Sequence, residues 1–103
     1  MAEVDDVLTA LADPTRRKLL DVVAARGSVS ASGLAEEFPV SRQAIVKHLA
    51  VLERAGLVVA HKAGREVRFA VRSEPLDATA AWMAGLASQW DDRLAAIKRI
   101  AES

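Results

Sequence analysis

The chain has 103 residues, which suits one domain with a single modest hydrophobic core. Hydrophobic residues make up 51% and charged residues 27%, a balance typical of globular rather than disordered chains. The absence of cysteine excludes disulfides, thiolate metal sites and cysteine nucleophiles. No apolar stretch approaches the ~18 residues of a membrane span, and residues 1–6 lack a signal-peptide pattern, so we expect a cytoplasmic protein without a membrane partner.

The net charge of +0 hides a segregation of charge along the chain. Residues 41–72 carry seven basic and two acidic side chains, whereas residues 1–40 and 73–103 are both net negative. A basic stretch inside a neutral protein indicates an anionic partner for that stretch, although a merely solvated basic face has the same composition. Charge alone leaves both interpretations open.

Two helices are predicted before residue 27. Apolar residues at helical spacing indicate a short amphipathic helix over about residues 3–12. Asp13 is the expected N-cap of a second helix, with Pro14 at its first position, where the missing N–H costs nothing. Gly27 is the expected residue after its end.

Two further helices follow, separated by a tight turn. Ser30 is expected to cap a short helix that ends near Glu37, and Ser41 to cap a longer one over about residues 42–55. Leu57 is expected to fold back on Leu52 in a Schellman cap. A short helix, a tight turn and a longer capped helix are the arrangement of a helix-turn-helix unit.

The hydrophobic period then changes from helical to strand-like. Residues 57–62 and 66–72 read as two strands of a hairpin, joined by a turn over residues 63–65 that contains Gly64. In the second strand, Val67, Phe69 and Val71 are expected on one face. A basic hairpin directly after a helix-turn-helix predicts a winged helix-turn-helix: a mainly α fold with a small hairpin and about five helices.

A long helix over about residues 75–102 is predicted to complete the domain, which spans residues 1–103. Its apolar residues alternate by four and three from Leu76 to Ala101, the seam of a heptad pattern. A domain of this size covers only part of such a face, so we expect a dimer paired through the first and last helices. The expected interface residues are Val4, Val7, Leu8, Leu11, Leu76, Met83, Leu86, Trp90, Leu94 and Ile97.

The fourth helix is the expected recognition helix. Its inward stripe leaves long polar side chains on the opposite side, where Gln43 suits adenine, Arg42 and Lys47 suit guanine or phosphate, and Val46 suits a thymine methyl. Arg65 beside Gly64 suits a phosphate or a narrow minor groove, although the wing charges are also explained as a solvated hairpin. The residues expected to contact double-stranded DNA are Ser41, Arg42, Gln43, Val46, Lys47, Lys62, Arg65, Arg68, Arg16 and Arg17.

Arg16 and Arg17 are included because they lie at a helix start, where positive charge is mildly unfavourable without a use such as backbone contact or pairing with an acid. His48 is expected to pack against the core, and His61 stands alone on a strand.

Residues 10–20, 41–49, 52–58 and the pair Gly64–Arg65 resemble motifs of the ArsR/SmtB family of winged-helix repressors. The resemblance implies a homodimer that represses transcription at an inverted repeat. Val46 stands where the family often has serine, so one polar DNA contact is replaced by an apolar one. The chain has no cysteine and its last helix has no histidine, so the resemblance is to the metal-independent, autorepressor type, with no metal and no cofactor expected.

The sequence favours one of three classes of function. The leading one is a dimeric DNA-binding repressor on a palindromic operator. Its residues Trp82, Met83, Leu86 and Trp90 suit either a plain dimer core or an apolar effector enclosed between subunits. The alternative is a winged-helix protein-interaction module that docks through its long last helix. An enzyme is not expected, because no glycine-rich phosphate loop, paired carboxylates or Ser/His/Asp spacing is present.

Overall fold

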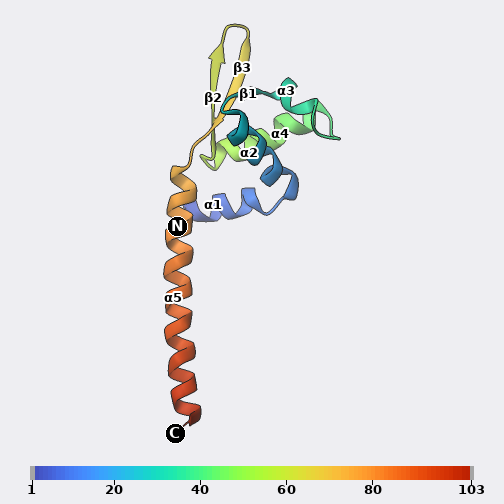
Figure 1. The fold of residues 1–103 in the computed structure, drawn as a ribbon. Helices are drawn as coiled ribbons and strands as arrows, with labels where there is room; N and C mark the ends of the chain where they lie inside the picture. The colour runs from blue at the N-terminus through green and yellow to red at the C-terminus, as the bar shows by residue number, and fades with distance from the viewer. Residues whose placement is uncertain (1, 103) are drawn as a thin grey trace.

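Helices account for most of the structure, a computed structural model that describes residues 2–102 (Figure 1). In chain order, the described elements are α1 (Ala2–Leu11), α2 (Pro14–Arg26), β1 (Val29–Ser30), α3 (Ala31–Ala35), α4 (Arg42–Arg54), β2 (Val58–Ala63), β3 (Glu66–Val71) and α5 (Glu74–Glu102). The prediction of a mainly helical winged helix-turn-helix with about five helices is confirmed.

One hydrophobic core holds α1 to α4 and the base of the hairpin together. Its members are buried because each helix turns one apolar stripe inward. The largest fully buried side chains are Leu19, Leu34, Ile45, Leu49, Leu52, Leu57, Val7, Val23 and Val58. The core therefore fixes which face of α4 remains outside.

The helix ends are set by local hydrogen bonds, as expected. Asp13 accepts from the backbone N–H of Thr15 at 2.8 Å, and Ser41 accepts from the N–H of Ala44 at 3.1 Å. At the end of α4, Gly56 takes a φ of 76° while the N–H of Leu57 donates to the carbonyl of Leu52 at 2.9 Å. That 6→1 bond is the Schellman cap predicted from the sequence.

The sheet has three strands in the order β1-β3-β2, all antiparallel, rather than the two expected. The missed strand, β1, pairs Val29 with Phe69 and Ser30 with Arg68. Two residues are too few to show the alternation of apolar and polar side chains by which a strand is predicted. This strand forms only because β3 lies beside it. Phe69 and Val71 pack on the core as predicted, whereas Val67 is 44% exposed because the wing extends beyond the core at that point.

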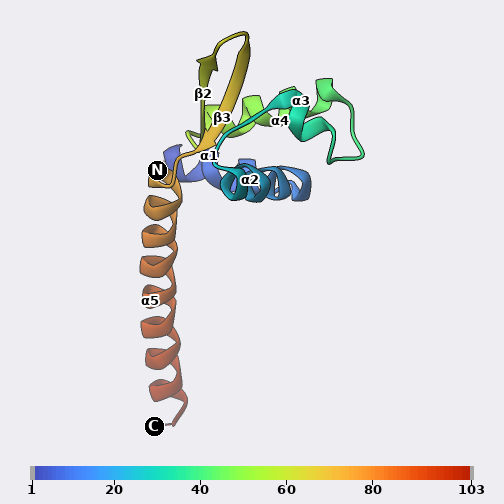
Figure 2. The same ribbon diagram turned by 45° about the horizontal axis from the view of Figure 1, so that its top comes forward.

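Helix α5 leaves the body soon after it begins. Pro75 and Thr79 are buried where α5 packs against α1, but beyond that contact nearly every side chain is exposed. Figures 1 and 2 show the rest of α5 as a straight rod that leads away from the other elements. The molecule is consequently elongated, with extents of 69 × 25 × 22 Å.

Candidate nucleic-acid interface

The first two turns of α4 present four side chains to solvent. Burial of Ile45, Leu49 and Leu52 turns the opposite side of the helix outward. Arg42, Gln43, Val46 and Lys47 are all exposed, and together they line one shallow depression on the surface. The structure thus brings the expected recognition-helix residues onto a single face.

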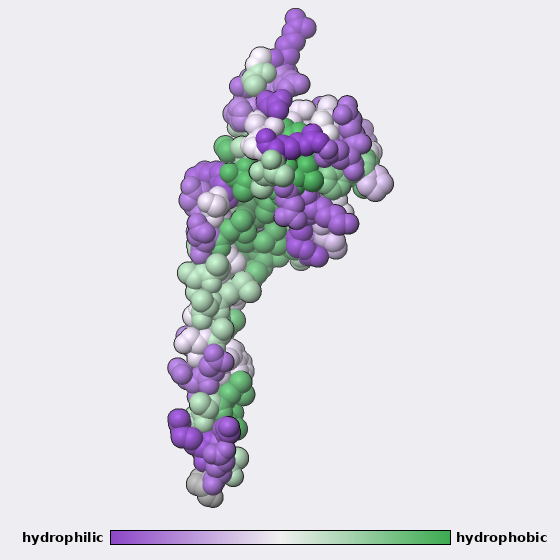
Figure 3. Space-filling view, viewed as in Figure 1, coloured by the Kyte–Doolittle hydropathy of each residue, from purple (hydrophilic) through white to green (hydrophobic). Residues whose placement is uncertain are grey.

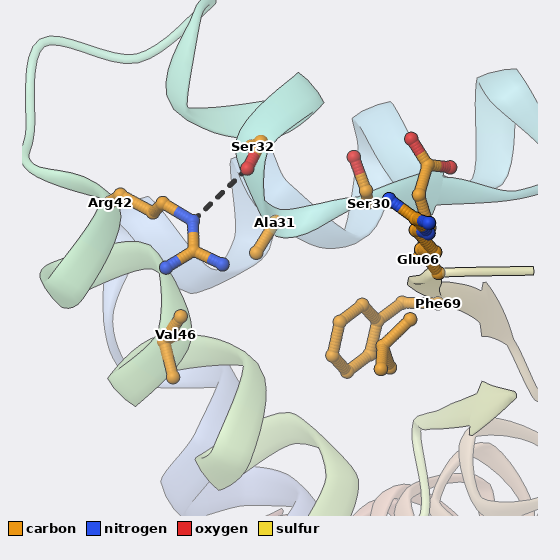
Figure 4. Close-up of a pocket in the computed structure, with 9 residues that line it drawn as sticks. Ser30, Ala31, Ser32, Arg42, Val46, Glu66 and Phe69 are labelled. Carbon is orange, nitrogen blue, oxygen red and sulfur yellow. Dashed lines mark hydrogen bonds between the residues drawn. The ribbon is translucent and has the colours of Figure 1, made fainter. Parts of the chain in front are cut away.

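The wing brings further positive charge to the same side of the molecule. A two-residue turn over Gly64 and Arg65 joins β2 to β3, and Gly64 takes a φ of 65° that suits glycine. Lys62 and Arg65 are both exposed near this tip. Arg65 lines the same cavity as Arg42 and Val46 of α4, so the tip of the wing and the recognition helix face a common space. Figure 4 shows Arg42 and Val46 across this space from Glu66 and Phe69 of β3.

Arg68, in contrast, is bound within the protein. Its Nε donates to the hydroxyl of Ser28 at 3.0 Å, and one Nη donates to the carbonyl of Ser28 at 2.7 Å. The other Nη donates to a carboxylate oxygen of Glu66 at 2.8 Å. These three bonds use three of the five N–H donors of the guanidinium and make Arg68 an anchor of the wing, which weighs against the expected DNA contact.

Arg16 and Arg17 also make hydrogen bonds within the protein. Arg16 donates to the carbonyls of Ala10 at 2.7 Å and Thr9 at 3.1 Å, and Arg17 donates to the carbonyl of Leu11 at 2.7 Å. These carbonyls belong to the last turn of α1, where the helix supplies few N–H partners, although that of Thr9 also accepts from the N–H of Ala12 at 3.3 Å. The contact to a protein backbone explains the two charges and weighs against the expected DNA contact.

A hydrogen bond that the sequence did not suggest orients Arg42. Its Nε donates to the hydroxyl of Ser32 in α3 at 3.0 Å, which holds the guanidinium at the cavity that Arg42 lines (Figure 4). The sequence gives no indication of these roles for Ser32 and Ser28, because a serine outside a capping position carries no local signal. Their partners lie 10 and 40 positions away in the chain.

The expected dimer residues fall into two groups. Val4 and Val7 are 5% and 0% exposed in the single chain, so they support its own core and offer a partner almost no surface; Leu11 and Leu76 pack against the same core. The others are exposed large hydrophobic side chains: Leu8, Met83, Leu86, Trp90, Leu94 and Ile97. In Figure 3, hydrophobic green patches recur down α5, whereas the tip of the wing is hydrophilic.

The titratable groups show one resolved effect. The backbone N–H of Arg16, then that of Thr15 and the charges of Arg16 and His48, lower the pKa of Asp13 below its ordinary value of 3.8. His48 itself is half-buried, and His61 is exposed. Within residues 2–102, no three His, Asp or Glu side chains gather as a metal would require.

Comparison with known proteins places this geometry in a family. A model of a helix-turn-helix domain matches residues 11–60. The transcriptional repressor SdpR of Bacillus subtilis is 31% identical over 91 residues, which cover 88% of this chain and 100% of SdpR. An ArsR-like transcriptional regulator from Rhodococcus sp. RHA1 is 48% identical, with a TM-score of 0.88 over 99% of this chain and 95% of its own.

The chain belongs to the ArsR family. A second ArsR-family structure, RHA00566, is 36% identical with a TM-score of 0.78, and covers 87% of this chain and 92% of its own. This ArsR-family chain is thus a transcriptional regulator with a helix-turn-helix DNA-binding domain. Its relatives are regulators rather than enzymes, and none of its described helices is long and apolar enough to cross a membrane.

Proposed function

We propose that this chain is a sequence-specific repressor that binds an inverted-repeat operator as a homodimer. The observation that carries the proposal is the common cavity onto which Arg42 and Val46 of α4 and Arg65 of the wing all open. A duplex that receives α4 in its major groove runs past the neighbouring wing, so both elements reach it together. The repressor activity is supported by the name of the relative SdpR.

The exposed side chains of α4 suit distinct contacts. Gln43 is able to bond an adenine edge through both amide atoms, and the two available Nη groups of Arg42 form a fork that suits guanine or phosphate. Val46 suits a thymine methyl, whereas Lys47 near the helix start suits phosphate. Ser41 holds the N-terminus of α4, whose exposed N–H groups also favour a phosphate.

The wing supplies charge rather than base recognition. Arg65 makes no hydrogen bond or ion pair with the residues that the structure describes, and it sits at the tip of an extended hairpin. Lys62 lies opposite Val67, on the side of the hairpin that also lines the cavity. Both suit the phosphates that flank the groove occupied by α4.

The partner of α5 is proposed to be α5 of a second copy. The exposed stripe of Met83, Leu86, Trp90, Leu94 and Ile97 is too long for a solvent-facing surface of a monomer. Residues of the heptad seam follow one another without interruption, so two copies bury the stripe continuously. Leu8 of α1, exposed beside the start of α5, extends the same apolar surface.

Flanking charges favour an antiparallel pair. In that orientation Asp77 faces Lys98 of the partner subunit. Two-fold symmetry gives a second, identical ion pair at the other end of the paired helices. A parallel pair places Arg93 opposite Lys98 of the partner subunit, where like charges repel. The antiparallel arrangement also places the two winged-helix bodies at opposite ends of the paired rods, which separates the surfaces proposed for the two half-sites.

An apolar effector between the subunits stays a prediction of the sequence. Trp82 and Met83 are exposed in the single chain, so a cavity between them and a partner exists only after pairing.

Selection of bound fragments from a random DNA library tests the proposal directly. The expected result is an inverted repeat, and binding of the selected fragment in a gel-shift assay is expected to weaken steeply with salt. Absence of an enriched sequence together with absent or salt-insensitive binding would contradict it.

The second candidate is a module that binds another protein through the exposed stripe of α5. Sedimentation of the isolated chain separates the two functions. A stable dimer is expected for the repressor, whereas the interaction module stays monomeric or aggregates until its partner is added.

A further inference from the structure

A half-enclosed cavity lies between the recognition helix and the wing (Figure 4). Its volume is about 390 Å³, which falls within the range of small-molecule pockets, roughly 300–1,000 Å³. Ala31, Val46, Val67 and Phe69 supply apolar walls from α3, α4 and β3. Val46 and Val67 are each 44% exposed, so apolar surface is left uncovered on both sides of the space.

Positive charge predominates at the cavity. Arg42 and Arg65 line it together with one acid, Glu66. The carboxylate of Glu66 is already bonded to Arg68 at 2.8 Å, which balances its charge beside the cavity. The two lining guanidiniums are therefore left to attract an anion.

Two serine hydroxyls of the lining are oriented by hydrogen bonds that they accept, and each keeps its own O–H to donate. The hydroxyl of Ser30 accepts from the N–H of Gly33 at 3.1 Å, and that of Ser32 accepts from Arg42 at 3.0 Å. The charged hydrogen-bond donors of the lining are the guanidiniums of Arg42, from α4, and of Arg65, from the wing. A ligand that fits has one anionic group and an apolar remainder.

We propose that this cavity binds a small organic carboxylate whose head is held by Arg42 and Arg65 and whose apolar body lies against Val46, Val67 and Phe69. The bound molecule occupies the space between α4 and the wing, and it engages the guanidinium that we assign to base recognition. Ligand and operator DNA therefore exclude each other, and the carboxylate releases the repressor. Only this competition rests on the proposed function; binding of the carboxylate does not.

Titration of the full, isotopically labelled chain with benzoate and hexanoate, followed by NMR without DNA, tests the site. We expect saturable shifts at the amides of Ala31, Val46, Val67 and Phe69 with the carboxylates but not with benzamide or hexanamide. Equal shifts with inorganic phosphate would overturn the inference, since the cavity would then be only a track for a DNA phosphate. Absence of saturable shifts with both carboxylates would overturn it as well.

A matched pair of variants locates the ligand. Val67→Asp places a like charge on the cavity wall and is expected to weaken benzoate binding about tenfold or more. Val59→Asp makes the same change at a residue that is 41% exposed on the other side of the hairpin, and it is expected to bind benzoate as the natural chain does. Equal weakening by both variants would contradict the site.

Competition is measured separately on the selected operator fragment. Benzoate is expected to raise the apparent dissociation constant for DNA in the natural chain and in Val59→Asp, but much less in Val67→Asp. Carboxylate binding without any DNA binding would refute the proposed function and leave the site intact. DNA binding that saturating benzoate leaves unchanged would refute the competition.

Discussion

The guanidinium of Arg68 donates to both the hydroxyl and the carbonyl of Ser28, a residue 40 positions earlier in the chain. Arg68 belongs to β3, the middle strand of the sheet, and Ser28 directly precedes β1. The pair therefore ties the wing to the end of α2. A hairpin on its own is free to pivot, whereas this one is held at a set angle to the recognition helix.

Substitution of Arg68 by glutamine is expected to destabilise the fold rather than remove a DNA contact. Loss of the charge-assisted bonds leaves the Ser28 carbonyl without its partner, which costs on the order of 1–2 kcal/mol of unfolding free energy. Urea denaturation measures the loss. Arg65→Gln, at the exposed tip, is the matched control, and an equal loss of stability in both variants would contradict the anchoring role.

Gln43→Ala and Arg42→Ala are expected to relax base specificity. Each change is predicted to cost about 1–3 kcal/mol of discrimination at one operator position, because a bidentate base contact is lost. Binding of the selected operator and of single-base variants measures the effect. Discrimination that stays unchanged at every position would place α4 outside the groove.

The salt dependence of DNA binding separates phosphate contacts from internal anchors. Lys62→Gln and Arg65→Gln are each expected to lower the slope of log affinity against log salt by about 0.9, the value for one phosphate contact. Arg17→Gln is expected to leave that slope unchanged, because Arg17 is bound to the carbonyl of Leu11. A reduced slope for Arg17→Gln would restore it as a DNA contact.

Substitution in the α5 stripe is expected to dissociate the proposed dimer. Leu94→Glu removes apolar burial of about 1.5–3 kcal/mol in each subunit and thereby weakens the dimer roughly a hundredfold or more. Ala95→Glu, one residue along and outside the heptad seam, is the control that adds the same charge. Analytical ultracentrifugation distinguishes them; dissociation by neither variant would remove α5 from the interface.

The orientation of the α5 pair is tested by exchange of charge. Asp77→Lys and Lys98→Asp are each expected to weaken the dimer several-fold, since exposed ion pairs contribute about 0.2–1 kcal/mol apiece. The double variant is expected to recover the affinity of the natural chain. Recovery fails if the helices run parallel.

Asp13 confers a pH dependence on stability. Because the folded chain lowers the pKa of Asp13 below 3.8, the ionised carboxylate stabilises the fold above that pH, and the contribution disappears as the pH falls through the lowered pKa. Asp13→Ala is therefore expected to melt below the natural chain at pH 7, with the gap narrowing under pH 3.8. Asp21→Ala, an exposed site on the same helix, is the control and is expected to show little gap at either pH.

Sequence alone determined the features whose causes lie within a few residues. Asp13 and Ser41 mark helix starts because a capping oxygen meets an N–H two or three positions ahead, and Gly56 marks an end because its own φ is positive. The inward stripe of α4, and with it the exposure of Arg42, Gln43, Val46 and Lys47, follows from helical period in the same way.

Tertiary structure alone decided the hydrogen-bond partners of side chains that meet another element of the fold. Three arginines predicted to contact DNA, Arg16, Arg17 and Arg68, donate to backbone carbonyls of the protein, because folding brings the end of α1 beside the first two and Ser28 beside the third. The strand β1 and the burial of Val7 have the same origin. An arginine guanidinium donates to a phosphate oxygen or to an unsatisfied backbone carbonyl. The packing of the chain therefore decides which of the two acceptors lies within hydrogen-bond distance.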